Sequence, residues 1–305
     1  MFNGFSRSVR GASHEARDLV CQDSSAHKVT EYYAVAVVAD GHGSKKHFRS
    51  NVGSRFAVES TVETIDRFYQ DPEEFEKSFP ERHKAVIKNI EKQIITTWNA
   101  KVTEHITANP VTPEEKSKFT DEEFAAINVE SYYGTTLIAA VAGRGFCFGL
   151  MIGDGNLVAV FDDGEAVLPM EYDESAPANV TASMCNANAA SMFNSFYRDK
   201  KKVLAMFTST DGLYTSFGSD YDFLDFHTII ASNLVKAEAM EASVYKNLEK
   251  RSHFGTEDDI SLSCVFDVEG VAENNELLLK KVAENKEKAA KRRKELLTTG
   301  LKTED

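Results

Sequence analysis

Short apolar runs that lead into or follow aspartate-bearing turns set the strongest constraint on how this chain can fold. The runs cover residues 34–39, 146–152, 203–207 and 260–266, and the turns are Asp40-Gly41-His42-Gly43, Gly153-Asp154-Gly155, Asp211-Gly212 and Asp258-Asp259. Runs of this length and composition predict strands, whose ends hold side chains in fixed places. Carboxylates that share a small volume repel one another unless a cation neutralises them. The pattern therefore predicts a cluster of oxygen ligands for divalent metal ions.

The connections between the apolar runs predict sheets that are mostly antiparallel. Ala142-Gly143-Arg144-Gly145 separates two of the runs as in a β-hairpin, and Asp162-Asp163-Gly164 ends a further run in the same way. Strands joined by hairpins pair antiparallel. Apolar residues at helical spacing predict two early helices, around Val58 to Tyr69 and Ile87 to Trp98, and two late ones near 230–237 and 244–248.

Three segments lack such a pattern. Residues 1–30 are predicted to be irregular, apart from a short strand leading into Cys21-Gln22-Asp23. Residues 99–131 are polar and charged, which predicts a surface excursion with one short helix. Residues 171–199 are rich in Ala, Asn and Ser, which predicts a loop over the sheet.

The C-terminal segment differs in composition from the rest. We divide the chain into a body, residues 1–270, and a charged tail, residues 271–305, dominated by Lys, Arg, Glu, Ala and Leu. Such a tail predicts a solvated helix. The alternative is a helix that docks a partner, and its apolar positions would be Leu277, Leu278 and Val282, or Leu296, Leu297 and Leu301.

Bulk properties exclude several classes of function. The chain has 305 residues and a net charge of −13, which argues against nucleic acid and anionic membrane surfaces as partners. No run approaches membrane-spanning length, and the first residues do not form a secretory signal, so we expect a cytoplasmic protein. The four cysteines form no C-x-x-C pair, which predicts buried thiols in place of disulfides or a zinc site.

The aspartate motifs predict how two ions would be shared. Mg²⁺ and Mn²⁺ prefer carboxylates, backbone carbonyls and water. Asp40 can bridge two ions, and Asp211 and Asp258 can complete one site. The Gly41 carbonyl and an early carboxylate such as Asp23 can complete the other. Two ions about 4 Å apart would activate a bridging water and clamp phosphate oxygens.

His42 lies inside the first motif and has two interpretations. An unperturbed imidazole has a pKa of about 6.5, so His42 could donate a proton to a departing alkoxide. Alternatively it is a turn histidine bound to a backbone carbonyl. The sequence alone leaves both open.

Taken together, the motifs resemble the metal-dependent protein phosphatase 2C family, including its bacterial serine/threonine phosphatases of the PPM type. The matching motifs, in family order, are Gln22-Asp23, Asp40-Gly41-His42-Gly43, Gly134-Thr135-Thr136, Gly153-Asp154-Gly155, Ser209-Thr210-Asp211-Gly212 and Gly255-Thr256-Glu257-Asp258-Asp259-Ile260-Ser261. The resemblance implies an α+β fold, a sandwich of two mostly antiparallel β-sheets flanked by pairs of α-helices. It implies hydrolysis of phosphoserine and phosphothreonine in proteins by a metal-bridged water.

The resemblance also implies roles for single residues. Asp40 would bridge two Mn²⁺ or Mg²⁺ ions, with Gly41 as a carbonyl ligand, Asp211 and Asp258 on the first ion and Asp23 on the second. Asp154 matches a position that helps bind a third, weaker ion. His42 matches the general acid, and the Gly134-Thr135-Thr136 motif is expected to be scaffold.

The chain departs from the family pattern at several positions. Gln22 stands where many members have Glu, and Asp18 stands where many have an arginine that holds the substrate phosphate. Arg17 and His14 are the nearby candidates for that role. The Gly155-Asn156 pair replaces Ser-Arg, with little expected consequence. These departures motivate two alternatives to the active phosphatase: a catalytically weak, phosphatase-like binding or regulatory module, and another two-metal hydrolase such as a phosphodiesterase or nuclease.

Overall fold

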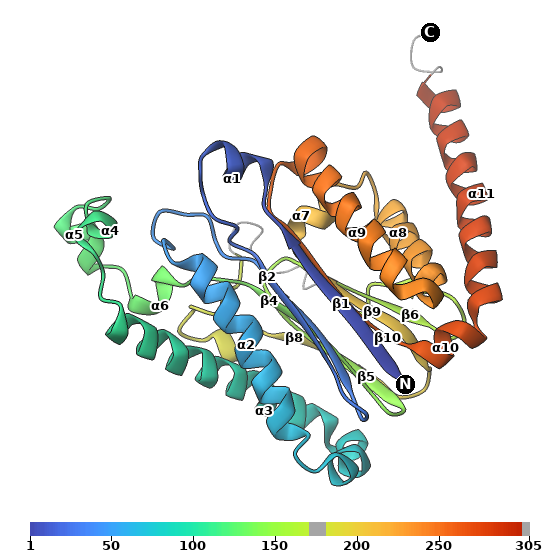
Figure 1. Ribbon diagram of the computed structural model, residues 1–305, viewed down its shortest axis with the longest axis horizontal. Coiled ribbons are helices and arrows are strands. Elements are labelled where there is room, and N and C mark those ends of the chain that lie inside the picture. The colour runs from blue at the N-terminus through green and yellow to red at the C-terminus, as the bar shows by residue number, and fades with distance from the viewer. Residues whose placement is uncertain (171–180, 301–305) are drawn as a thin grey trace.

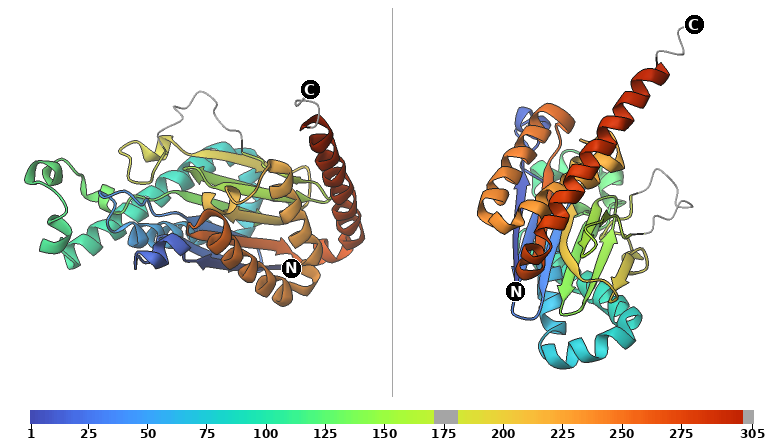
Figure 2. Two further views of the ribbon diagram at one scale, coloured as in Figure 1. Left: turned by 90° about the horizontal axis from the view of Figure 1, so that it is seen from above. Right: turned by 90° about the vertical axis from the view of Figure 1, so that its right-hand side faces the viewer.

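Two stacked β-sheets lie between two layers of helices. The computed structural model describes residues 1–170 and 181–300. Figures 1 and 2 show α2 and α3 on one side of the stacked sheets and α8, α9 and α11 on the other. No helix of the described residues is long and apolar enough to cross a membrane.

Within the described ranges, each sheet has five strands and every strand pairing is antiparallel. The first sheet runs in the order β1-β10-β9-β6-β7, with the bounds Phe2–Val9, Ile260–Asp267, Val203–Ser209, Asn156–Phe161 and Ala166–Val167. The second runs in the order β2-β3-β4-β5-β8, with the bounds Ser24–Val29, Ala34–Ala39, Leu137–Gly143, Phe146–Ile152 and Asn194–Arg198. These sheets confirm the predicted α+β sandwich.

The helices cover the outer face of each sheet. Those on the second sheet's side are α2 (Ser50–Phe68), α3 (Pro72–Ala108), α4 (Pro113–Lys116), α5 (Asp121–Ala125) and α6 (Val129–Tyr132). Those on the first sheet's side are α8 (Asp220–Asn233), α9 (Ala237–Arg251), α10 (Val268–Glu273) and α11 (Asn275–Gly300). The short helices α1 (Ala12–Ala16) and α7 (Asp211–Tyr214) lie beside strand ends. Shorter helical turns are η1 (Ala189–Ser191), η2 (Leu234–Lys236) and η3 (Ser252–Thr256).

The four-layer arrangement explains why the central strands are continuously apolar. In β3, Val35, Val37 and Ala39 face the helices α2 and α3, while the intervening residues face the other sheet. All six residues of the strand are fully buried. An antiparallel sheet with one wet face would alternate polar and apolar residues, but here both faces are covered. The predicted strands at 34–39, 146–152, 203–207 and 260–266 are all confirmed.

Three predictions about irregular segments are wrong. Residues 1–30 contain two full strands, β1 and β2, which form neighbouring edges of the two sheets. The segment 99–131 continues α3 to Ala108 and then forms three short helices in place of one. The segment 171–199 ends in the strand β8, although residues 171–180 lie outside those described.

The tail forms the predicted helix, α11, which extends away from the body (Figure 1). It contacts α8 from Asn275, which donates to the Ser232 carbonyl, to Arg292, which lies over the Tyr221 ring, and Leu278 is fully buried in the core beneath that helix layer. Leu277, Leu278 and Val282 are each at least partly buried, so this apolar face packs against the body. The side chains of Leu296, Leu297 and Leu301 lie outside the described part of the chain.

Candidate active site

The aspartate turns converge because of strand pairing. Ser24, the first residue of β2, pairs with Ala39, the last of β3. The start of β6 likewise pairs with the end of β9, at Asn156 and Ser209. Because every pairing is antiparallel, the start of one strand lies beside the end of its neighbour. The segments carrying the five predicted aspartate ligands therefore meet at one end of the sandwich, which we call the acidic end; these aspartates are Asp23, Asp40, Asp154, Asp211 and Asp258.

The backbone of Asp40 is held by the Gly134-Thr135-Thr136 motif. The Asp40 N–H donates to Thr136 Oγ1 at 3.0 Å. The Asp40 carbonyl accepts from Thr135 Oγ1 at 2.7 Å and from the Thr136 N–H at 2.9 Å. Next to it, a Cβ on Gly41 would lie 2.6 Å from the Gln22 carbonyl oxygen, so only glycine fits. These contacts fix the backbone positions from which the Asp40 side chain and the Gly41 carbonyl group project.

The carboxylates of Asp40 and Asp211 lie together. Burial raises the pKa of Asp40 well above its usual range, and the charges of Asp23, Asp211 and Asp258 raise it further. The pKa of Asp211 is also raised, by burial and then by the charge of Asp154, although a hydrogen bond with Asp40 opposes the shift. Aspartate side chains from five separate segments thus raise or lower one another's pKa.

Asp23 is the most enclosed member of the group. It is 7% exposed, and burial followed by the charge of Asp259 raises its pKa well above the usual range. Thr210 Oγ1 donates a hydrogen bond of 2.8 Å to Asp23 Oδ2 and itself accepts one of 2.9 Å from the Ser261 N–H. The hydroxyl of Thr210 therefore links Asp23 to the end of β9, which precedes Asp211, and to the start of β10, which follows Asp258.

The donor set suits hard divalent cations, because carboxylates that raise one another's pKa are stabilised when a cation lies between them. In the described residues, no three His, Cys, Asp or Glu side chains already form an enclosing metal site. Asp40 and Asp211 instead hydrogen-bond to each other. The carboxylates thus lie close together, and to bind an ion Asp40 and Asp211 would have to direct their oxygens towards it.

His42 stands beside this group with a strongly lowered basicity. Burial, followed by the nearby charges of His47 and Lys46, lowers its pKa to about 4, although the charge of Asp154 opposes the shift. The rings of His42 and His47 lie 4.9 Å apart between centroids. The backbone N–H of His42 donates to the Gly134 carbonyl oxygen at 3.1 Å. The free protein therefore holds His42 neutral near pH 7.

The two candidates for binding substrate phosphate point elsewhere in this structure. Arg17 is exposed and donates to the carbonyl of Ser13 at 3.0 Å, within its own turn. His14 is 7% exposed, and its Nδ1 lies 2.9 Å from Asp259 Oδ2.

Thr210 and Asp259 are the site-supporting residues that sequence reasoning missed. Both lie inside motifs that were recognised, directly before Asp211 and directly after Asp258. Their polar side chains next to proposed ligands were the available signal.

Comparison with known proteins then identifies the family. A family model described as protein phosphatase 2C matches residues 10–249, which is most of the chain. The chain belongs to the protein phosphatase 2C family. No curated protein matches the sequence.

Solved structures share the protein phosphatase 2C fold at low identity. The serine/threonine phosphatase PstP/Ppp of Mycobacterium tuberculosis is 14% identical, with a TM-score of 0.51 over 87% of this chain and 98% of that one. Stp1 of Staphylococcus aureus is 12% identical, with a TM-score of 0.53 over 88% and 95%. PppA of Pseudomonas aeruginosa, described as a key regulatory component of T6SS, is 16% identical, with a TM-score of 0.51 over 87% and 97%. At these identities the likeness shows the fold.

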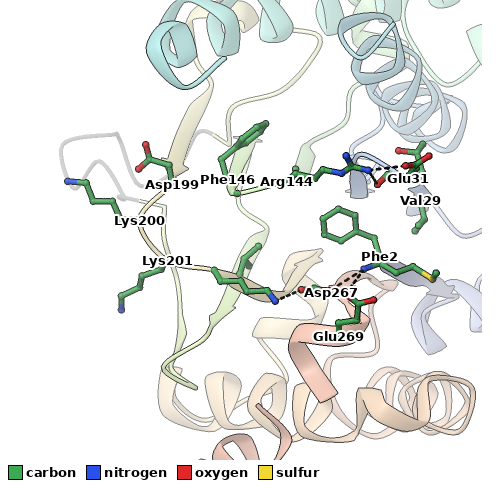
Figure 3. Close-up of a pocket in the computed structure, with 16 residues that line it drawn as sticks. Phe2, Val29, Glu31, Arg144, Phe146, Asp199, Lys200, Lys201, Asp267 and Glu269 are labelled. Atoms are coloured by element: carbon green, nitrogen blue, oxygen red, sulfur yellow. Dashed lines mark hydrogen bonds and ion pairs between the residues drawn. The ribbon is translucent and has the colours of Figure 1, made fainter. Parts of the chain in front are cut away.

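A cavity of about 880 Å³ lies at the other end of the sandwich, which we call the distal end (Figure 3). Phe2 and Phe146 line it, together with charged residues of the β4–β5 and β8–β9 turns. Arg144 pairs with Glu31 at 3.1 Å, and Lys202 pairs with Asp267 at 2.9 Å. The charges of this cavity largely satisfy one another, so it is a poor candidate for the chemistry of the family.

Proposed function

We propose that this member of the protein phosphatase 2C family is a metal-dependent protein serine/threonine phosphatase that hydrolyses phosphomonoesters. One observation carries the proposal: aspartates from distant segments gather at one end of the family fold and raise one another's pKa. Keeping such groups together costs stability, and a divalent cation would offset that cost. The family is typically metal-dependent, in line with this chemistry.

The proposed ligands are the five aspartates and one carbonyl. Asp40 would be shared by two Mn²⁺ or Mg²⁺ ions, with Asp211 and Asp258 on one side and Asp23 and the Gly41 carbonyl on the other. Asp154, which is exposed and already affects the pKa of Asp211, would serve a third ion. When bound, such ions supply an activated water and neutralise phosphate oxygens.

His42 is the proposed general acid for the departing serine or threonine oxygen. Its lowered pKa leaves it neutral in the free protein near pH 7. A phosphate dianion placed beside the ring would favour the imidazolium and raise that pKa. In this proposal the substrate thus helps to charge the group that protonates its own leaving oxygen. Substrates would be phosphoserine and phosphothreonine proteins, met in the cytoplasm.

A specific observation supports the second candidate, a phosphatase-like binding module. The described carboxylates do not enclose a ready metal site, and Arg17 bonds within its own turn. A module would bind Mn²⁺ or a phosphoprotein without turnover.

One assay separates the two. Hydrolysis of p-nitrophenyl phosphate and of a phosphothreonine peptide is measured with Mn²⁺, for the wild type and for Asp211→Ala. Metal-dependent turnover that disappears in the variant supports the phosphatase. Manganese binding without turnover supports the module, and cleavage of a phosphodiester without cleavage of monoesters would reject both.

A further inference from the structure

Asp259 is a buried carboxylate that contacts two separate segments of the chain, the start of α1 and the segment before β2. It is 4% exposed. Its Oδ1 accepts a hydrogen bond of 2.6 Å from the Gly11 N–H, and its Oδ2 accepts one of 2.6 Å from the Gln22 N–H. The same Oδ2 lies 2.9 Å from Nδ1 of His14, on α1. These donors are 237 to 248 residues away in sequence.

The neighbours of this carboxylate are two of the proposed metal ligands. Asp258 immediately precedes Asp259, and Asp23 immediately follows Gln22. The loop that carries Gly11 packs tightly on the same place, since a Cβ there would lie 2.5 Å from the backbone carbon of Asp258. One side chain therefore joins the segment holding Asp23 to the segment holding Asp258.

A carboxylate suits this place better than an amide. Removing an ionised carboxylate from water is costly unless N–H donors surround it, and charge-assisted hydrogen bonds are stronger than neutral ones. Each Asp259 oxygen faces at least one donor. An asparagine would offer one accepting oxygen and turn an NH₂ group towards the donors on the other side.

We propose that Asp259, braced by His14, is a positioning residue that sets the distance between Asp23 and Asp258 and thereby the affinity of the acidic end for divalent cations. The inference rests on the proposed metal-dependent function and goes further in assigning the residues that shape the site. Asp259 itself holds no ion in this proposal. Groups that orient metal ligands typically change metal affinity by about 10- to 100-fold when they are altered.

The first experiment compares matched variants at the two ends of β10. Mn²⁺ binding to the metal-free full chain is measured by calorimetry for the wild type, Asp259→Asn and Asp267→Asn. The control makes the same chemical change at a carboxylate of the distal end. We expect Mn²⁺ to bind Asp259→Asn about 10- to 100-fold more weakly than the wild type, and Asp267→Asn to match the wild type.

The second experiment tests His14 by rescue. His14→Ala removes the donor to Asp259, whereas His14→Asn can place an amide N–H near the position of Nδ1. We expect weaker Mn²⁺ binding in the alanine variant and recovery of most of that loss in the asparagine variant. A role limited to filling space would leave the two small variants alike. If Asp259→Asn does not fold, the two His14 variants still test the positioning role.

The outcomes separate this inference from the proposed function. A folded Asp259→Asn, or a folded His14→Ala, that binds Mn²⁺ as tightly as the wild type overturns the positioning role and leaves the phosphatase intact. A wild type that binds neither Mn²⁺ nor Mg²⁺ overturns both. Weaker binding in Asp259→Asn with normal binding in Asp267→Asn, together with rescue by His14→Asn, supports the proposal.

Discussion

The acidic end and the distal end of the sandwich both carry carboxylates at strand termini, but they treat them differently. At the distal end, burial acts to raise the pKa of Asp267, but the hydrogen bond and charge of Lys202, together with a hydrogen bond from the Gly270 N–H, outweigh it and the pKa lies below its usual range. At the acidic end, burial and neighbouring carboxylates both raise the pKa of Asp40. The negative charge of Asp267 is paired with lysine at the distal end, whereas several carboxylates lie close together at the acidic end.

The two ends therefore differ in what offsets the free-energy cost of their buried carboxylates. Pairing a carboxylate with lysine at the protein surface is inexpensive, and the distal end shows that this fold accommodates it. Acidic side chains that repel one another persist only where something outside the chain compensates. The contrast between two ends of the same strands, more than any single aspartate, is our reason for proposing the metal site at the acidic end.

The largest expected effect is on turnover when one carboxylate is neutralised at each end. Asp40→Asn removes the proposed shared ligand and should lower Mn²⁺-dependent hydrolysis of p-nitrophenyl phosphate by about 10³-fold or more, a loss of about 4 kcal/mol in transition-state stabilisation. Asp267→Asn should stay within about twofold of the wild type. Comparable losses in both variants would show that the two ends do not differ in function.

Much of the contrast could be predicted from sequence because the central strands are covered on both faces. Continuous apolar runs mark such strands, and the aspartates lie just before or just after them, so the gathering of these side chains at one end could be predicted from sequence. The starts of α4 and α5 could also have been predicted from the sequence, from their N-cap residues Thr112 and Thr120. Thr112 with Glu115, and Thr120 with Glu123, form the reciprocal hydrogen bonds of capping boxes, a pattern visible in the sequence.

The edge strands β1 and β8 could not be predicted from apolar runs. In β1 only Phe5 and Val9 are buried, and in β8 only Phe196 is. Part of the remaining face of β1 is satisfied by polar contacts, such as the 2.8 Å hydrogen bond between Ser8 and Ser25 of β2. A strand that packs through hydroxyls carries little hydrophobic periodicity, so residues 1–30 looked irregular.

The support around Asp259 was unpredictable for a different reason. Its partners at Gly11, His14 and Gln22 come from the far end of the chain. Spacing along the sequence says nothing about contacts over such separations. The pairing of β1 with β10, in which Val9 lies opposite Ile260, brings the segment that follows β1 beside Asp259.

A second prediction concerns stabilisation by metal. A ligand that binds only the folded state stabilises it by about 2.7 kcal/mol at 100 times its dissociation constant. Mn²⁺ at that excess should raise the free energy of unfolding of the wild type and of Asp267→Asn by about this amount, measured by urea denaturation, and EDTA should reverse it. Asp40→Asn should show little of the effect. Full stabilisation of Asp40→Asn by Mn²⁺ would place the ion elsewhere.

The smallest expected effect is also the most discriminating, because its sign differs between the two ends. In the metal-free protein, the raised pKa of Asp40 means that the folded state binds a proton more tightly than the unfolded chain, so stability is lost as pH rises above the unfolded pKa of about 3.9. The lowered pKa of Asp267 means the reverse: its contribution is present above that pH and is lost as pH falls. At pH 7 in EDTA, Asp40→Asn should therefore be more stable than the wild type, and Asp267→Asn less stable, each by about 1 kcal/mol.

The difference at Asp40 should shrink as the pH is lowered towards 4, because its carboxyl group, whose pKa is raised, then becomes protonated and resembles the amide. The difference at Asp267 should largely persist at pH 4, because its lowered pKa keeps that carboxylate ionised in the folded state. Urea denaturation at pH 7, 5.5 and 4 in EDTA measures this directly. A destabilised Asp40→Asn at pH 7 would mean that its carboxylate is favourably paired in the absence of metal. The acidic end would then be stabilised internally like the distal end, and the electrostatic reason for placing an ion there would be lost.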